Sequence, residues 1–219
     1  PRSEDNLFKP EIAAPGQQII SAAMGEGTAG APLNGTSMAT PHMAGVVALL
    51  KQAKPGLTAQ DIKGLLMSTT TLLAKGGQRI PLTLQGAGRV QIDKALTADF
   101  VPTPGAISLG LVQVSEGALL KRPLTLKNLT NSTVQLRLSA QSSAHISIEM
   151  PSAVTLAAFE SRTLELGIKV LNDEKATPRS EIESMIFLER HGEIVGQIPV
   201  LGIRAVATEI RASGTTDQG

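Results

Sequence analysis

The stretch 34–45, Asn-Gly-Thr-Ser-Met-Ala-Thr-Pro-His-Met-Ala-Gly, constrains the fold of this chain more than any other stretch. Gly35 permits a sharp turn, Thr36 or Ser37 can cap a helix, and the apolar run 46–50 continues the helix. Ser37 then lies at the positive end of the helix, where unpaired backbone N–H groups can bind a negative oxygen. This position suits a nucleophile in acyl transfer.

The helix is expected to extend from about Thr36 to Ala53. Pro41 lies near its first turn, where a proline costs at most one helical hydrogen bond, and Pro55-Gly56 follows its end. Through Leu50 the helix is apolar on every side, which is typical of a buried helix. We therefore expect it to pack on a sheet that is largely missing here, which leaves apolar surface open on this chain.

This run resembles the serine motif of the subtilisin-like serine peptidases, the subtilases. The stretch 9–16 (Lys-Pro-Glu-Ile-Ala-Ala-Pro-Gly) and the stretch 86–90 (Gly-Ala-Gly-Arg-Val) are similar to segments that flank that motif in the family. The family usually has Asp where this chain has Glu11, so the charge is kept. The resemblance covers roughly the first hundred residues. It implies that Ser37 is the catalytic nucleophile and that its backbone N–H is one oxyanion donor.

The resemblance also implies that the catalytic machinery is incomplete on this chain. In the family the catalytic Asp, the catalytic His and an oxyanion-stabilising Asn precede the serine, and none of those segments is present here. His42 lies roughly 140° around the helix axis from Ser37, so we do not expect it to act as the base. His145 and His191 fall in a different part of the chain. The substrate-binding residues stay unknown.

We therefore expect the carboxy-terminal part of a secreted or cell-surface serine endopeptidase that forms an acyl-enzyme on Ser37. The chain alone is expected to be inactive or nearly so. Its expected partners are a protein or peptide substrate and the rest of the peptidase domain. The alternative is a non-catalytic binding or structural module that carries a peptidase remnant. Upstream sequence with an Asp-bearing strand end and a His-bearing helix would favour the enzyme.

The composition narrows the partners and cofactors. A net charge of +1, with 2% aromatic residues and neither Trp nor Tyr, gives no support for a nucleic-acid partner. The absence of Cys excludes disulfides and thiolate metal sites. No apolar run is long enough to span a membrane. We expect no metal or other cofactor on this chain, although the resemblance allows a structural calcium in the remainder of the domain. Glu181, Glu183 and Glu189 alternate as on a solvated strand face. A calcium site among them is the alternative, which we do not favour because no compact loop of oxygen ligands is evident.

Within the first hundred residues four further elements are expected. Ile19 and Ile20 are typical of a short buried strand of a parallel sheet. Thr58 and Asp61 form a capping box at the start of a second helix. The stretches 80–84 and 90–96 are expected to form a short strand and a short helix.

After an expected linker at 102–105 (Pro-Thr-Pro-Gly), the chain changes to alternating apolar and polar residues. The pattern predicts an antiparallel β-sandwich of about seven strands. The strands that we could bound are 122–127, 134–139, 145–149, 162–170, 184–189 and 194–206, with a hairpin turn at Gly192. The core of this sandwich must be aliphatic, with Phe159 and Phe187 as the largest side chains expected in it.

The fold class is thus α/β, a partial subtilisin-like parallel-sheet domain, followed by an all-β sandwich. By position and strand pattern the sandwich resembles the fibronectin-III-like domain that follows the catalytic domain in larger subtilases. The expected bounds are 1–100 for the peptidase part, 101–212 for the sandwich and 213–219 for a disordered tail.

Two smaller features remain open. Met38, next to Ser37, is interpreted as core filler, with an oxidation-sensitive neighbour of the nucleophile as the alternative. Asn34, Asn128 and Asn131 begin Asn-x-Ser/Thr sequons, which are short enough to arise by chance. We assign Asn34 a role in the backbone turn, because a glycan there would obstruct the nucleophile.

Overall fold

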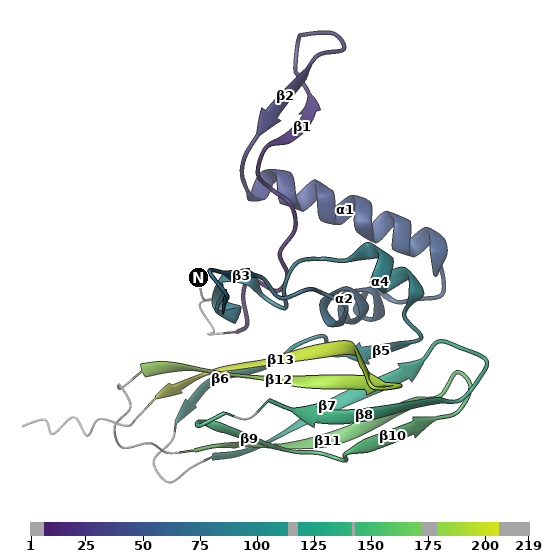
Figure 1. Cartoon of the computed structure of the whole chain (residues 1–219), viewed down its shortest axis with the longest axis vertical. Coiled ribbons are helices and arrows are strands. Elements are labelled where there is room, and N and C mark those ends of the chain that lie inside the picture. Colours follow the sequence, from purple (N-terminus) through teal and green to yellow (C-terminus); the bar gives the residue numbers. More distant parts are fainter. Residues whose placement is uncertain (1–6, 114–117, 142, 172–178, 206–219) are drawn as a thin grey trace, which may run out of the picture.

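A computed structural model describes residues 7–113, 118–141, 143–171 and 179–205. A layer of helices, from which one hairpin projects, lies against two stacked β-sheets (Figure 1). The tail predicted for residues 213–219 lies outside the described residues. Among the residues described, no helix is both long and apolar enough to cross a bilayer.

The first hundred residues form four helices and two small hairpins in their described part. In chain order these elements are β1 (Ile19–Ala22), β2 (Gly30–Leu33), α1 (Thr36–Ala53), α2 (Ala59–Ser68), β3 (Ala74–Lys75), β4 (Gln78–Arg79), α3 (Leu82–Gln85) and α4 (Ile92–Thr97).

The helix α1 has the predicted bounds and leaves apolar surface open as expected, but the predicted side-chain cap is wrong. Its N-cap is Gly35, and no side chain caps it. Only Val46 and Leu50 of this helix are buried, whereas Leu49 is 54% exposed. The described elements α2 and α4 pack on one side of α1 alone, so its other apolar side faces solvent (Figure 1).

The predicted capping box at the start of α2 is confirmed. Asp61 N donates to Thr58 Oγ1 and Thr58 N donates to the Asp61 carboxylate, both at 3.1 Å. This reciprocal pair satisfies two backbone donors that the first turn of a helix otherwise leaves free. The short helix expected at 90–96 also forms, as α4.

The buried parallel strand predicted at Ile19 and Ile20 is wrong. These residues belong to β1, which pairs antiparallel with β2 in a hairpin that projects from the body, and Ile20 is 74% exposed (Figure 1). Gly25 and Gly27 have positive φ, which turns the chain back within a few residues. In the described part of the first hundred residues, parallel pairing is confined to one bridge, between Ala13 and Arg89.

The strand predicted at 80–84 is also wrong. Residues 82–85 form the helical turn α3 directly after Pro81, whose fixed φ suits a helix start. The backbone N–H of Leu82 donates to the carboxylate of Glu183 at 3.1 Å.

Residues 100–205 form two sheets, with nine strands in their described part against about seven predicted. One sheet has the order β10-β8-β12-β13-β6 and the other β5-β7-β11-β9. The pair β6–β13 is parallel, so the prediction of a wholly antiparallel arrangement is wrong. The bounds are β5 (Phe100–Thr103), β6 (Ile107–Gln113), β7 (Ala118–Asn128), β8 (Val134–Ala140), β9 (Ile146–Glu149), β10 (Ala153–Leu156), β11 (Ser161–Val170), β12 (Arg179–Arg190) and β13 (Glu193–Ala205).

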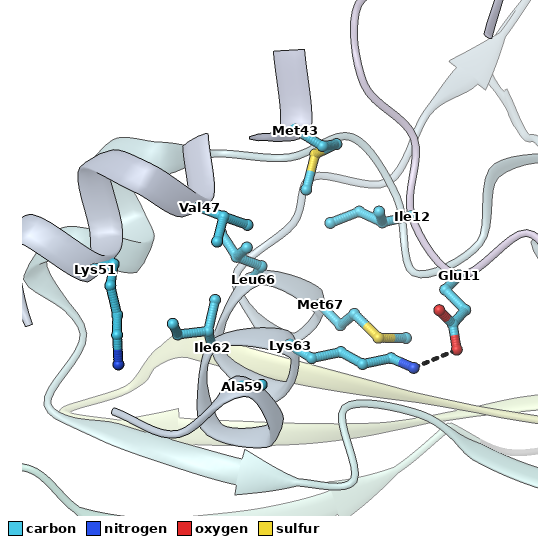
Figure 2. A pocket seen from close by; sticks show the side chains of 10 residues that line it. All are labelled: Glu11, Ile12, Met43, Val47, Lys51, Ala59, Ile62, Lys63, Leu66 and Met67. Atoms are coloured by element: carbon cyan, nitrogen blue, oxygen red, sulfur yellow. Dashed lines mark hydrogen bonds and ion pairs between the residues drawn. The ribbon is translucent and has the colours of Figure 1, made fainter. Parts of the chain in front are cut away.

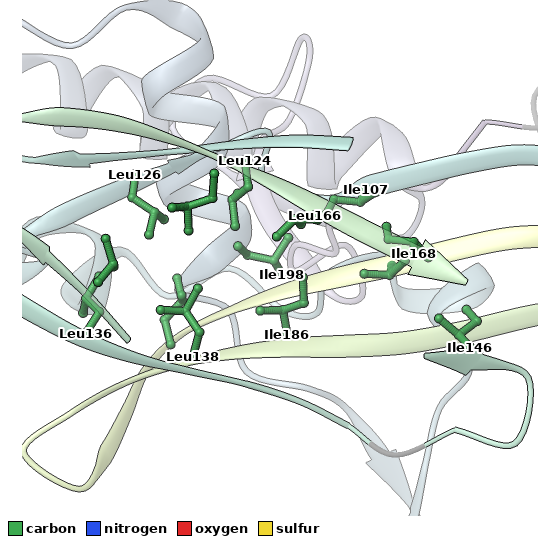
Figure 3. Packing of buried hydrophobic residues seen from close by; sticks show 14 of the residues in the cluster. Ile107, Leu124, Leu126, Leu136, Leu138, Ile146, Leu166, Ile168, Ile186 and Ile198 are labelled. Carbon is green, nitrogen blue, oxygen red and sulfur yellow. The ribbon is translucent and has the colours of Figure 1, made fainter. Parts of the chain in front are cut away.

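Both sheets contribute to one hydrophobic core. Leucine, isoleucine and valine side chains fill it, as Figure 3 shows for Leu124, Leu166, Ile186 and Ile198. The aliphatic core predicted from the composition is therefore present, with Phe100 as an aromatic member.

The two phenylalanines predicted for the core lie elsewhere. Phe159 is 66% exposed at a turn where its φ is 56°, because the chain reverses there between β10 and β11. Phe187 packs with Phe8 and Met185 in a cluster where the first hundred residues meet the sheets. Its strand β12 alternates faces, so neighbouring residues on this strand serve different cores.

The linker predicted at 102–105 is not a flexible connection. Its first two residues belong to β5, which pairs with β7, and the preceding Phe100 and Val101 are buried. β5 packs against α2, where Gly64 lies under the carbonyl of Pro102. The two halves of the chain are thus joined by a packed strand.

Candidate active site

Ser37 occupies the first turn of α1 and is exposed to solvent. Within the described part of the chain, no hydrogen bond involves its hydroxyl, so the oxygen is available to a partner. Gly35, two residues earlier, has a φ of 143°, which L-residues with side chains rarely adopt. The sharp turn predicted from the sequence is therefore present directly before Ser37.

The turn is held from the amino-terminal side of the hairpin. Gly35 N donates to Gly16 O at 2.7 Å. A Cβ atom on Gly16 would lie 2.7 Å from Gly35 O, so only glycine fits there. Gln18 N donates to Asn34 Oδ1 at 2.6 Å. The backbone role expected for Asn34 is consistent with this bond, which joins the two ends of the hairpin beside Ser37.

The start of α1 offers backbone donors. Met38 N donates to Gly35 O at 3.1 Å, and this is the first hydrogen bond of the helix. The amides of Thr36 and Ser37 come before this bond, and the first amides of any helix lack partners within the helix. That the Ser37 N–H stabilises an oxyanion stays a prediction. Met38 itself is half-buried, which leaves both interpretations of this residue open.

None of the three histidines is positioned as a base for Ser37. His42 is exposed on α1, and its side chain forms no hydrogen bond within the described part of the chain. His145 precedes β9, and His191 lies in the β12–β13 turn beside Gly192, as predicted for that hairpin. Both belong to the sheet layers, which α2 and α4 separate from α1 (Figure 1).

An apolar groove of about 450 Å³ lies below α1, between this helix and α2. Figure 2 shows Met43 and Val47 of α1 facing Ile62 and Leu66 of α2 across it. The full lining comprises Glu11, Ile12, Met43, Val47, Lys51, Ala59, Ile62, Lys63, Leu66 and Met67. Because only three of these side chains are charged, the groove is suited to apolar side chains.

Glu11 lies at one end of this groove and forms two ion pairs. Its Oε1 is 2.5 Å from Lys63 Nζ and 3.2 Å from Lys9 Nζ. Burial raises the pKa of Glu11, but the hydrogen bonds and charges of Lys63 and Lys9 outweigh it and hold the pKa below its usual value. The carboxylate that replaces the family's usual Asp is thus fixed as a charged anchor. The role of Lys63 gave no signal in the sequence, because it comes from a distant helix.

Other candidate groups have structural roles. Glu183 pairs with Arg79, and Ser139 donates to Glu189 at 3.1 Å. Among the residues described, no three acidic, histidine or cysteine side chains gather as metal ligands would. Asn128 is 1% exposed, and its Nδ2 donates to Ser132 O and Ala157 O, both at 2.7 Å. This sequon is closed to glycosylation in the folded chain.

Comparison with known proteins gives the following relatives. Residues 1–88 match the sequence model of the subtilase family. The chain is 32% identical over 207 residues to the minor extracellular protease Vpr of Bacillus subtilis (strain 168), which covers 89% of this chain and 25% of that protein. It is 42% identical over 88 residues to the subtilisin-like protease SBT2.6 of Arabidopsis thaliana, which covers 36% of this chain and 10% of that protein.

Among solved structures, tripeptidyl peptidase 2 aligns with 78% of this chain and 16% of its own, with 18% identity and a TM-score of 0.45. The chain thus spans a quarter or less of each of these proteins. The sequence matches support a subtilase identity.

Proposed function

From the subtilase match over residues 1–88, we propose that this chain is the carboxy-terminal part of a serine endopeptidase. The enzyme hydrolyses peptide bonds through an acyl-enzyme on Ser37. The exposed position of Ser37 on the first turn of α1, after the sharp turn at Gly35, carries the proposal. The name of the Bacillus relative, an extracellular protease, supports a secreted location for this protein as well.

The rest of the catalytic machinery comes from polypeptide outside this chain. A serine hydroxyl is a weak nucleophile at neutral pH and needs a base within hydrogen-bond reach, itself oriented by a third group. The described residues bring no histidine to Ser37. We therefore assign the catalytic Asp, His and oxyanion Asn to the preceding part of the peptidase domain, so that the chain alone is inactive.

In the complete enzyme the reaction divides between the two parts. The incoming histidine removes the proton from Ser37 Oγ as this oxygen attacks the carbonyl carbon of the scissile peptide bond. The carbonyl oxygen becomes negative, and the Ser37 N–H at the helix start donates to it. The intermediate collapses to an acyl-enzyme as the amine leaves with the proton, and water then releases the acid.

The open side of α1 is where the rest of the peptidase domain docks. Leu49 is 54% exposed on this helix, whereas Val47, 36% exposed, lines the groove that α1 forms with α2. A helix that is apolar on every side is normally buried. Its exposure here is consistent with relatives that are at least four times longer than their match to this chain.

We retain the two-part division as a proposal, with residues 1–100 as peptidase and 101–212 as a fibronectin-III-like sandwich. The sandwich accompanies the peptidase domain and makes no contact with Ser37 in the described structure.

The test of function is hydrolysis of an unfolded protein or a fluorogenic peptide by the complete protein.

The Ser37→Ala variant should lower the rate by at least about a thousandfold, because the nucleophile is lost. Ser21→Ala, in the exposed strand β1, is the matched control and should keep the rate. Two results would favour the binding-module alternative. One is a complete, folded protein that binds peptides but cleaves none, and the other is a Ser37→Ala variant as active as the unmodified protein.

A further inference from the structure

We propose that Gln197, in strand β13 of the sandwich, is a positioning residue for the turn that carries Ser37. This inference goes beyond the proposed function and rests on it where activity is concerned. Gln197 is 8% exposed and lies where β13 meets the first hundred residues. Its Nε2 donates to Thr70 Oγ1 at 3.0 Å and to Ala87 O at 3.2 Å.

Backbone hydrogen bonds, joined by the short stretch of chain 13–16, lead from these acceptors towards the nucleophile. Ala87 N donates to Glu11 O, and Ala13 N donates to Gly88 O, both at 2.9 Å. These bonds attach the stretch 11–14 to the stretch 87–90 that Gln197 contacts. Gly16, just beyond, accepts the 2.7 Å bond from Gly35 N. Ser37 follows two residues later.

The contacts along this route leave little room for adjustment. A Cβ atom on Gly86 would lie 2.4 Å from the carbonyl carbon of Glu11, and one on Gly88 would lie 2.7 Å from Thr71 O. Close-packed backbone transmits a displacement instead of absorbing it. A shift of the stretch 87–90 would therefore move the stretch 11–16 and the turn at Gly35.

A second contact supports the same layer from the sandwich. Lys127 Nζ of β7 donates to the Asp61 carboxylate at 3.0 Å, and Asp61 also completes the capping box of α2. The α2 helix packs under α1 through Ile62 and Leu66. The sandwich thus holds the start of α2 through Lys127 and the residues beyond its end through Gln197.

Hydrogen exchange in the complete protein tests the inference without depending on activity. Gln197→Met keeps the length of the side chain and removes the donor. We expect amide exchange at Ala13, Ala87 and Gly35 to accelerate about tenfold, the factor for one lost buried hydrogen bond. Amides in the sandwich core, such as that of Leu166, should keep their rates. Gln135→Met, on the exposed side of β8, is the matched control.

Kinetics of the same variants separate this inference from the proposed function. Gln197→Met should lower kcat about tenfold with little change in KM, because a misplaced nucleophile affects the chemical step. Lys127→Met should act in the same direction. Lys121→Met, on the same strand and paired with the exposed Glu165, should act on neither.

Two results would overturn the inference. One is an unchanged exchange rate at Ala13, Ala87 and Gly35 in Gln197→Met. The other is a uniform acceleration that includes the sandwich core, which would mark Gln197 as a general stabiliser. An inactive wild-type protein would instead refute the proposed function, and the exchange data would still decide the role of Gln197.

Discussion

Replacing Gly64 by alanine should separate the helix α2 from the strand β5. A Cβ atom at this position would lie 2.0 Å from the backbone oxygen of Pro102, whereas ordinary contact begins at 3.4 Å. The helix and strand would therefore have to part by about 1.4 Å. Because the obstacle is backbone and not a flexible side chain, the cost belongs at the upper end of about 1–3 kcal/mol for overpacking, or above it.

The higher helix propensity of alanine than of glycine offsets about 1 kcal/mol of this loss. We expect a net loss of about 2–3 kcal/mol in the free energy of unfolding, which corresponds to a fall in Tm of roughly 5–10 °C for a chain of this length. Thermal unfolding of the 219-residue chain, followed by circular dichroism, measures it.

Gly45→Ala in α1 is the matched control, since a Cβ atom there meets nothing within 4 Å. It should raise the free energy of unfolding by about 0.5–1 kcal/mol, from helix propensity alone. Equal stability of the Gly64→Ala and Gly45→Ala chains would refute the packing of α2 on β5 as described.

Three further predictions concern glycosylation, acid and the separate halves. After expression in a host that glycosylates secreted proteins, mass spectrometry should find Asn128 unmodified, because its amide is buried and bonded; a glycan there in folded protein would contradict the structure. Burial raises the pKa of Asp61, but hydrogen bonds from Lys127 and Thr58 outweigh it and lower the pKa below its usual value. The stability from this depressed pKa is present above the unfolded value and is lost as the pH falls through the folded one. Unfolding titrations should thus show a loss below about pH 4 that Asp61→Asn makes shallower, and an unaltered slope would speak against the pair. Residues 1–100 alone should give no cooperative melt as a monomer, since α2 would lose β5 and β13; a sharp monomeric transition would count against this.

Local start and stop signals explain which helices could be predicted from the sequence. Gly35 and Pro55-Gly56 mark both ends of α1, and Thr58 with Asp61 marks the start of α2. Each signal acts within a few residues, so it does not depend on the remainder of the fold. Ser37 could be proposed as the nucleophile for the same reason, because its motif is contiguous.

The errors arose where long-range contacts decide the structure. Ile19 and Ile20 have the pattern of a buried strand, but they pair with β2 in a projecting hairpin. The Pro-rich stretch 102–105 has the composition of a linker, yet β7 and α2 fix it in place. Gln197 gave no signal at all, because its acceptors lie more than a hundred residues away in the sequence.

Labelling of the complete protein with a fluorophosphonate tests the central claim most directly. The reagent should phosphonylate Ser37, found by mass spectrometry of the peptide that contains it, and Ser37→Ala should abolish the adduct. A folded, mature protein that takes up no label on Ser37, or takes it up on another residue, would contradict the assignment of Ser37 as the nucleophile.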